Sequence, residues 1–126
     1  MAEIDVTAQL GKILNEYSKE VKRATNNSID VVAKESVQKL KDNSPKKSGS
    51  YAKGWRLKRS RGLTGINEVT IHNATDYQLT HLLENGHIVR NKKGEYGRAP
   101  AHPHIAPVED WIGQELPEEI RKELEE

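Results

Sequence analysis

The 126-residue chain contains no cysteine and no phenylalanine, and aromatic residues make up only 5% of it. Without cysteine it can form neither a disulfide framework nor a thiolate metal site. Its length predicts a single domain spanning residues 1–126, but hydrophobic residues at 34% and charged residues at 31% leave that domain a thin core. We therefore expect association with further copies to help stabilise it.

Long apolar runs are also missing. The N-terminus lacks the basic flank and apolar run of a signal peptide, and no later stretch approaches the roughly 20 apolar residues of a membrane helix. These absences predict a soluble protein that is made in the cytoplasm and has no membrane partner.

Charge is divided unevenly along the chain, although the formal net charge is only +1. Residues 44–66 contain seven basic side chains and no acidic one, whereas residues 107–126 contain eight acidic and two basic ones. Such segregation favours contact between the basic segment of one copy and the acidic end of another. The alternative is that both runs are simply solvated surface.

Apolar residues recur every three or four positions from residue 4 to about residue 40, as in an amphipathic helix. At ~1.5 Å per residue this helix would be about 55 Å long, more than a compact domain of this size covers. Part of it should therefore pack against a neighbouring protein. The weak helix formers at residues 25–28 leave open whether there is one helix or two, the second capped by Asn27 or Ser28.

Turn formers and charges at residues 44–53 predict a flexible loop. Apolar and polar residues alternate around Trp55 and Ile71, which predicts two strands joined through the glycine-containing residues 61–65. A second hairpin should begin near Ile88 and carry a lysine-rich tip.

A short helix of about three turns should begin at Thr75 or Asp76 and end at Gly86. A C-terminal helix should start at Pro107, and Pro117 should kink it or begin another turn. The predicted fold class is α+β, with a long N-terminal helix, a small antiparallel sheet of about four strands, a short middle helix and a C-terminal helix.

Candidate chemistry is sparse in this sequence. His81, Glu84 and His87 recur at a spacing that places side chains on one helix face, but they match no established metal-ligand motif. Nucleophile and phosphate-loop motifs are absent as well, so we predict a protein that is not an enzyme and has no metal site. The residues that we expect instead to determine the fold are Glu84, Gly86, His102 and His104.

The basic residues between positions 46 and 61 are the best candidate for a binding surface. They would attract phosphate, and Tyr51 and Trp55 among them could stack on bases, so a small nucleic-acid-binding module is the alternative function. Trp55, however, shares the apolar phase of its strand with Leu57, which indicates burial. The residues that we expect at a protein interface are Lys46, Lys47, Tyr51, Trp55, Arg56 and Arg59.

An ordered set of motifs runs through residues 44–116. In chain order it consists of Ser44-Pro45 with Ser48-Gly49-Ser50, Val69-Thr70-Ile71-His72-Asn73, Tyr77, Leu83-Glu84-Asn85-Gly86-His87 and Arg98-Ala99-Pro100-Ala101-His102-Pro103-His104-Ile105-Ala106-Pro107. This set resembles the tail-completion or head–tail joining family of long-tailed bacteriophages.

In that family, subunits form a ring, commonly sixfold, at the end of the tail tube, and the ring docks onto the connector of a filled head. The resemblance implies a structural subunit of the virion that assembles in the host cytoplasm and needs no cofactor. Its implied partners are further copies of itself in a hexameric ring, a head-closure or connector protein, a tail tube or tail terminator protein and, transiently, packaged DNA.

Overall fold

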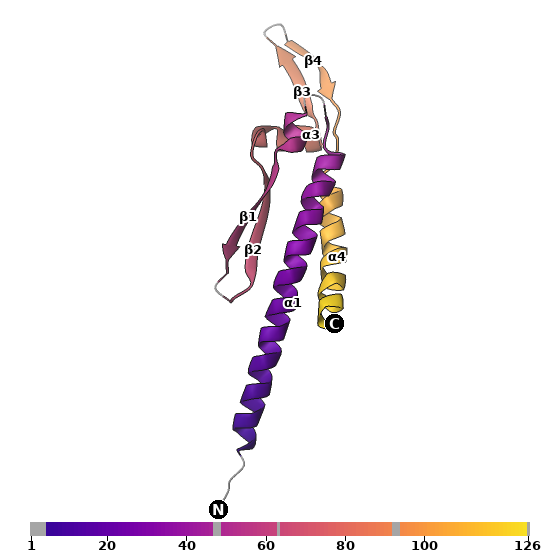
Figure 1. The fold of residues 1–126 in the computed structure, drawn as a ribbon. Coiled ribbons are helices and arrows are strands. Elements are labelled where there is room, and N and C mark those ends of the chain that lie inside the picture. The colour runs from indigo at the N-terminus through magenta and orange to yellow at the C-terminus, as the bar shows by residue number, and fades with distance from the viewer. Residues whose placement is uncertain (1–4, 47–48, 63, 92–93, 126) are drawn as a thin grey trace, which may run out of the picture.

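The computed structural model describes residues 5–46, 49–62, 64–91 and 94–125. It is an α+β fold, as predicted (Figure 1). The elements in chain order are α1 (Val6–Asn43), α2 (Ser50–Lys53), β1 (Trp55–Arg61), β2 (Asn67–Asn73), the 3-10 turn η1 (Tyr77–Leu79), α3 (Thr80–Asn85), β3 (His87–Asn91), β4 (Gly94–Ala99) and α4 (Ala106–Glu125).

The N-terminal helix is one continuous element of 38 residues. The side chain of Asp5 caps its first turn. Polar residues in its interior do not interrupt it: the buried Ser28 and Ser36 donate their hydroxyls to the carbonyls of Ala24 and Val32, each at 2.7 Å. Because each hydroxyl bonds a carbonyl of its own helix, neither serine interrupts α1. Their small side chains also let other elements approach the helix closely.

The four strands form two separate antiparallel ribbons, so the prediction of one sheet of about four strands was wrong. β1 pairs with β2, and β3 pairs with β4. Between the ribbons lie η1 and α3, and the two hairpins extend in opposite directions from this junction (Figure 1). Their edges therefore do not meet.

The core lies where the C-terminal end of α1 meets α2, the start of β1 and the start of α4. Its buried members are Leu40, Tyr51, Trp55 and Val108. From this point α4 runs back beside α1, and an ion pair at 3.3 Å joins Arg23 of α1 to Glu123 of α4 near the far end (Figure 1). The first hairpin also packs on α1, through both of its strands.

Two hydrogen bonds hold the tip of the first hairpin to α1. The Asn26 side chain donates to the Gly65 carbonyl at 3.0 Å, and its oxygen accepts the N–H of Asn67 at 2.9 Å. A residue that sequence reasoning treated as a weak helix former thus serves as a tertiary contact.

Three local predictions need correction. Residues 50–53 of the expected loop form α2, because Tyr51 and Ala52 are buried. No side-chain bond from Asp76 caps the middle helix; Asn73 instead accepts the N–H groups of both Thr75 and Asp76.

The third correction concerns Pro117, which lies inside a continuous α4, so no separate turn begins there. A proline leaves the carbonyl four residues earlier, that of Gly113, without its helical donor. Both residues are exposed, so water can satisfy that carbonyl.

Candidate functional site

A buried hydrogen-bonded cluster connects α2, α3 and the start of α4. His104 Nε2 lies 2.7 Å from Tyr51 Oη, and His104 Nδ1 lies 2.6 Å from the His102 carbonyl oxygen. Because a carbonyl only accepts, Nδ1 carries a proton, and in the neutral imidazole Tyr51 donates to Nε2. Burial and the nearby Glu84 carboxylate raise the pKa of Tyr51 to about 12. Tyr51 therefore keeps its proton at neutral pH and can donate this hydrogen bond.

Glu84 accepts hydrogen bonds from three backbone N–H groups at the start of α4. Its Oε1 accepts from His104 at 2.8 Å and Ile105 at 2.9 Å, and its Oε2 accepts from Ala106 at 3.0 Å. Burial by itself raises the pKa of the Glu84 carboxyl, but these donors outweigh that effect and hold the pKa below its usual value. The carboxylate also complements the positive end of the helix dipole.

Gly86 and His102 complete the group of residues expected to determine the fold. Gly86 has φ 76°, and a Cβ there would lie 2.7 Å from the Ala99 carbonyl oxygen, so only glycine fits. His102 acts through its backbone: its N–H donates to the Leu83 carbonyl at 2.7 Å. The cluster thus joins the short middle helix to α4.

The candidate metal residues do not converge. Both oxygens of Glu84 bind backbone N–H groups, and His81 is exposed. Within the described ranges, no group of three histidine or carboxylate side chains is placed to hold a metal ion. The hydrogen bonds of Glu84 instead join α3 to the start of α4.

The two aromatic residues proposed for the interface lie in the core. Tyr51 is 3% exposed and Trp55 is 4% exposed. Trp55 Nε1 donates to Ser44 Oγ at 2.8 Å, and Ser44 in turn bonds the Leu40 carbonyl at the end of α1. Because neither ring can stack on a base, the nucleic-acid alternative loses its aromatic contribution.

The basic interface candidates remain at the surface, apart from Lys47, which lies outside the described residues. Lys46 and Arg56 are exposed. Arg59 is also exposed, but its guanidinium lies 3.1 Å from the Asp30 carboxylate of α1. It therefore contributes to holding the first hairpin against α1, whereas Arg56 lies on the outward face of the hairpin.

The acidic end of the chain forms the exposed side of α4. Glu118 pairs with Arg121 one turn later, at 2.5 Å, while Glu109 and Asp110 are exposed near the start of the helix. The basic and acidic surfaces therefore belong to two different elements of one chain, β1 and α4.

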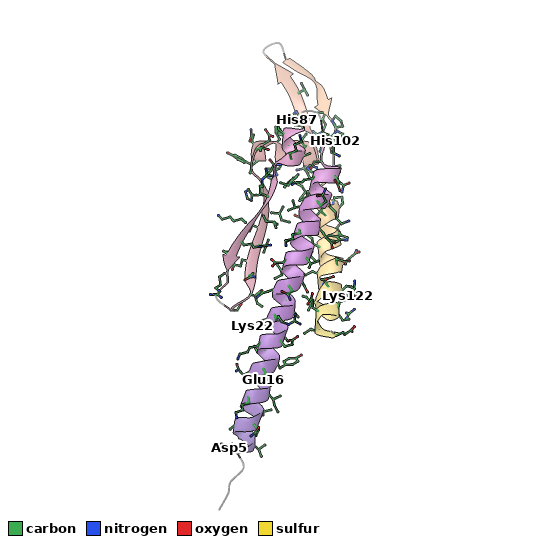
Figure 2. All side chains as sticks on the ribbon, in the orientation of Figure 1. Asp5, Glu16, Lys22, His87, His102 and Lys122 are labelled. Carbon is green, nitrogen blue, oxygen red and sulfur yellow. The ribbon has the colours of Figure 1, made fainter. Side chains whose placement is uncertain are left out.

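The first part of α1 projects beyond the rest of the molecule, as Figure 2 shows for the segment from Asp5 to Glu16. Every residue from 5 to 20 is exposed. Five large apolar side chains in this segment, with exposed fractions of 53% to 74%, lie on one helix face. We call them the free stripe: Val6, Leu10, Ile13, Leu14 and Tyr17. The length of the helix indicated from sequence that part of it would lack cover, but not which end.

An apolar groove lies between β2 and α4, with α1 beneath it. It consists of two adjoining hollows of about 730 and 230 Å³. Val69 and Ile71 line it from β2, and Ile112 and Leu116 line it from α4. This β2–α4 groove depends on how three elements pack, so no sequence pattern predicted it.

None of the described helices is long and apolar enough to cross a lipid bilayer.

A family model described as "Bacteriophage HK97-gp10, putative tail-component" matches residues 8–86, more than half of the chain. No curated protein and no solved structure matches it.

Proposed function

Because the chain belongs to the HK97-gp10-like family of bacteriophage tail components, we propose that it is a subunit of the ring that joins the tail tube to the head connector during virion assembly. Membership of this family confirms the resemblance to phage tail and neck proteins read from the sequence. It also assigns a structural role in the tail, within the virion and beside other structural proteins.

The observation that carries the proposal is the free stripe. Five large apolar side chains stand in water on a helix segment, residues 5–20, in which every residue is exposed. Contiguous exposed apolar surface is a mark of protein–protein contact sites. A subunit whose longest helix is half uncovered is suited to a larger assembly.

The separation of basic from acidic side chains favours one orientation of neighbouring subunits in such an assembly. Arg56 and Lys58 lie on the outward face of the first hairpin, while Glu109 and Asp110 are exposed on α4. In a ring each subunit offers two different surfaces, one to each neighbour. A basic hairpin that faces the acidic α4 of the next copy steers association and disfavours the reverse orientation.

The other proposed partners lie above and below the ring. A head-closure or connector protein would bind one face and a tail tube or tail terminator protein the other, with packaged DNA passing through. Lys46, exposed just after α1, is available for such a contact. The ring performs this joining role by binding alone, without an enzymatic step.

Electron microscopy of the purified protein, alone and with tail tubes, tests the proposal. We expect rings, with six subunits as the expected number, either free or at the tube end. Monomers under both conditions would contradict it. Salt-dependent binding to duplex DNA in place of ring formation would favour the nucleic-acid alternative.

A charge reversal tests the directing contact. Arg56→Glu with Lys58→Glu should impair ring formation and leave the chain folded, and rising salt should weaken wild-type rings in the same way. The matched control is Lys19→Glu with Lys34→Glu, which changes the net charge equally at exposed positions of α1, outside both β1 and α4. Equal oligomer mass by light scattering for both double variants would exclude the directing role.

A further inference from the structure

We infer that the free stripe of one copy lies in the β2–α4 groove of the next copy, so that each subunit lends a helix to its neighbour. The inference rests on the proposed ring and names the two surfaces that build it. Both surfaces are apolar and both belong to this chain.

The groove has the shape of a helix-binding site. α1 forms its floor through residues such as Val32 and Ala33, β2 forms one wall and α4 forms the other. The remaining side is open. Proteins that bind an amphipathic helix in this way take up apolar anchors spaced three and four residues apart, which is the spacing of the free stripe.

The lengths also agree. Along β2, the groove extends from Asn67 to Asn73, which is about 20 Å at ~3.3 Å per residue. The free stripe extends from Val6 to Tyr17, or about 17 Å. The whole stripe therefore fits within the groove.

The helix of the same chain cannot fill this groove. Its residues 5–20 continue straight on from the part of α1 that forms the floor, and they lead away from the groove (Figure 2). Folding back would break a continuous helix. The occupant is therefore another molecule.

A second copy fits because the stripe continues a face of α1 that is buried further along the same helix. Leu10, Leu14 and Tyr17 lie on the same helix face as Ala24 and Ser28, which are fully buried where α1 packs on the rest of its own chain. The chemistry of that face already suits α4 and the first hairpin. In the next copy it would meet the same two elements from their open side.

This contact uses a projecting helix on one copy and a groove on the next, so it is head-to-tail. Contacts of this type repeat from subunit to subunit and close into a ring when the rotation between copies allows it. Twofold pairing of two free stripes would instead stop at a dimer. The two arrangements predict different cross-linked products.

Engineered cysteines distinguish them, because the chain has none of its own. Leu14→Cys on the stripe combined with Thr70→Cys, exposed at the groove edge, should give a ladder of covalent multimers with a short bismaleimide. Asn15→Cys combined with Thr70→Cys is the control, since Asn15 lies on the opposite face of α1. Dimers from Leu14→Cys alone would show twofold pairing and overturn the inference.

Removal of the stripe gives a second readout. Leu10→Ser with Leu14→Ser should raise the concentration needed for half-assembly about 100-fold or more, with unchanged helix content by circular dichroism. Ala8→Ser with Asn15→Ser, the control, also introduces two serines into this segment, but on the opposite face of α1, and should assemble normally. Rings that persist in the leucine variant, together with the absence of a ladder, would overturn the inference and leave the proposed ring intact. Monomeric wild-type protein, alone and on tail tubes, would overturn both.

Discussion

The two halves of α1 share one backbone and one apolar periodicity, yet they differ in what covers them. Residues 24–43 include all the buried residues of α1 and pack against α4, the first hairpin and the core, whereas every residue from 5 to 20 is exposed and this segment projects beyond them (Figure 2). Both halves carry apolar side chains at helical spacing. The contrast teaches that an apolar helix face shows the need for a partner without showing that the partner belongs to the same chain.

Among the substitutions that affect the buried part of α1, we expect Trp55→Ala to cause the largest loss of stability. This substitution removes a buried ring against the end of α1 and should lower the free energy of unfolding by about 3–5 kcal/mol, measured by urea denaturation. Trp55→Phe keeps most of the ring and loses chiefly the bond to Ser44, so its cost should be smaller. Similar stabilities for the alanine variant and the wild type would contradict the assigned core.

A substitution at the start of α4 should lower the free energy of unfolding by less, and the loss should depend on pH. Glu84→Gln weakens the cap on three N–H groups and should cost about 2 kcal/mol at neutral pH. Because the pKa of Glu84 is lower in the folded protein than the ordinary glutamate value of 4.5, this stabilisation is present above pH 4.5 and is lost as the pH falls through the folded value.

Urea titrations at several pH values provide the measurement. The gap between wild type and Glu84→Gln should shrink as the pH falls below 4.5. Glu109→Gln, an exposed carboxylate in the first turn of α4, is the control and should change stability by about 0.5 kcal/mol or less. A gap that widens in acid would contradict the assigned role of Glu84.

The boundary between the two halves lies near Asn26, which holds the hairpin tip. Asn26→Ala removes both bonds to that tip and should cost about 1 kcal/mol in the free energy of unfolding. Amide exchange at Asn67 should become faster, since that N–H loses its acceptor. The neighbouring exposed residue supplies the control: Asn27→Ala should leave exchange at Asn67 unchanged.

The smallest change in the free energy of unfolding is expected for the exposed part of α1, residues 5–20. In the dissociated chain, Leu10→Ser with Leu14→Ser should change the free energy of unfolding by about 0.5 kcal/mol or less, because the two side chains are 53% and 57% exposed. The same pair should have its large effect only on assembly. A loss of several kcal/mol in the monomer would show that the stripe is covered within its own chain.

Periodicity and turn chemistry predicted much of the local structure correctly. The long helix, the first hairpin around Trp55 and Ile71, the terminating Gly86 and the start of α4 near Pro107 all agree with the structure. These features depend on neighbouring residues in the chain. The predictions that were wrong, such as one sheet of about four strands and a new turn beginning at Pro117, depend on where elements lie in space or on hydration of a single carbonyl.

The candidate interface shows the same division. Composition and spacing identified the basic segment, but burial removed Tyr51 and Trp55 from its surface and an ion pair with Asp30 tied Arg59 to α1. The β2–α4 groove had no counterpart in any motif. Its lining residues come from three elements that are distant in sequence.

By itself the sequence determined the phage-tail family, the α+β class, a helix too long for its own domain and the separation of basic from acidic charge. Only the tertiary structure decided which half of α1 is bare, that the hairpins point apart and that an open apolar groove lies between β2 and α4. The physical reason is the range of the interactions involved. Helical spacing, capping and turns are settled by residues close together in the chain, whereas burial depends on which distant surfaces meet.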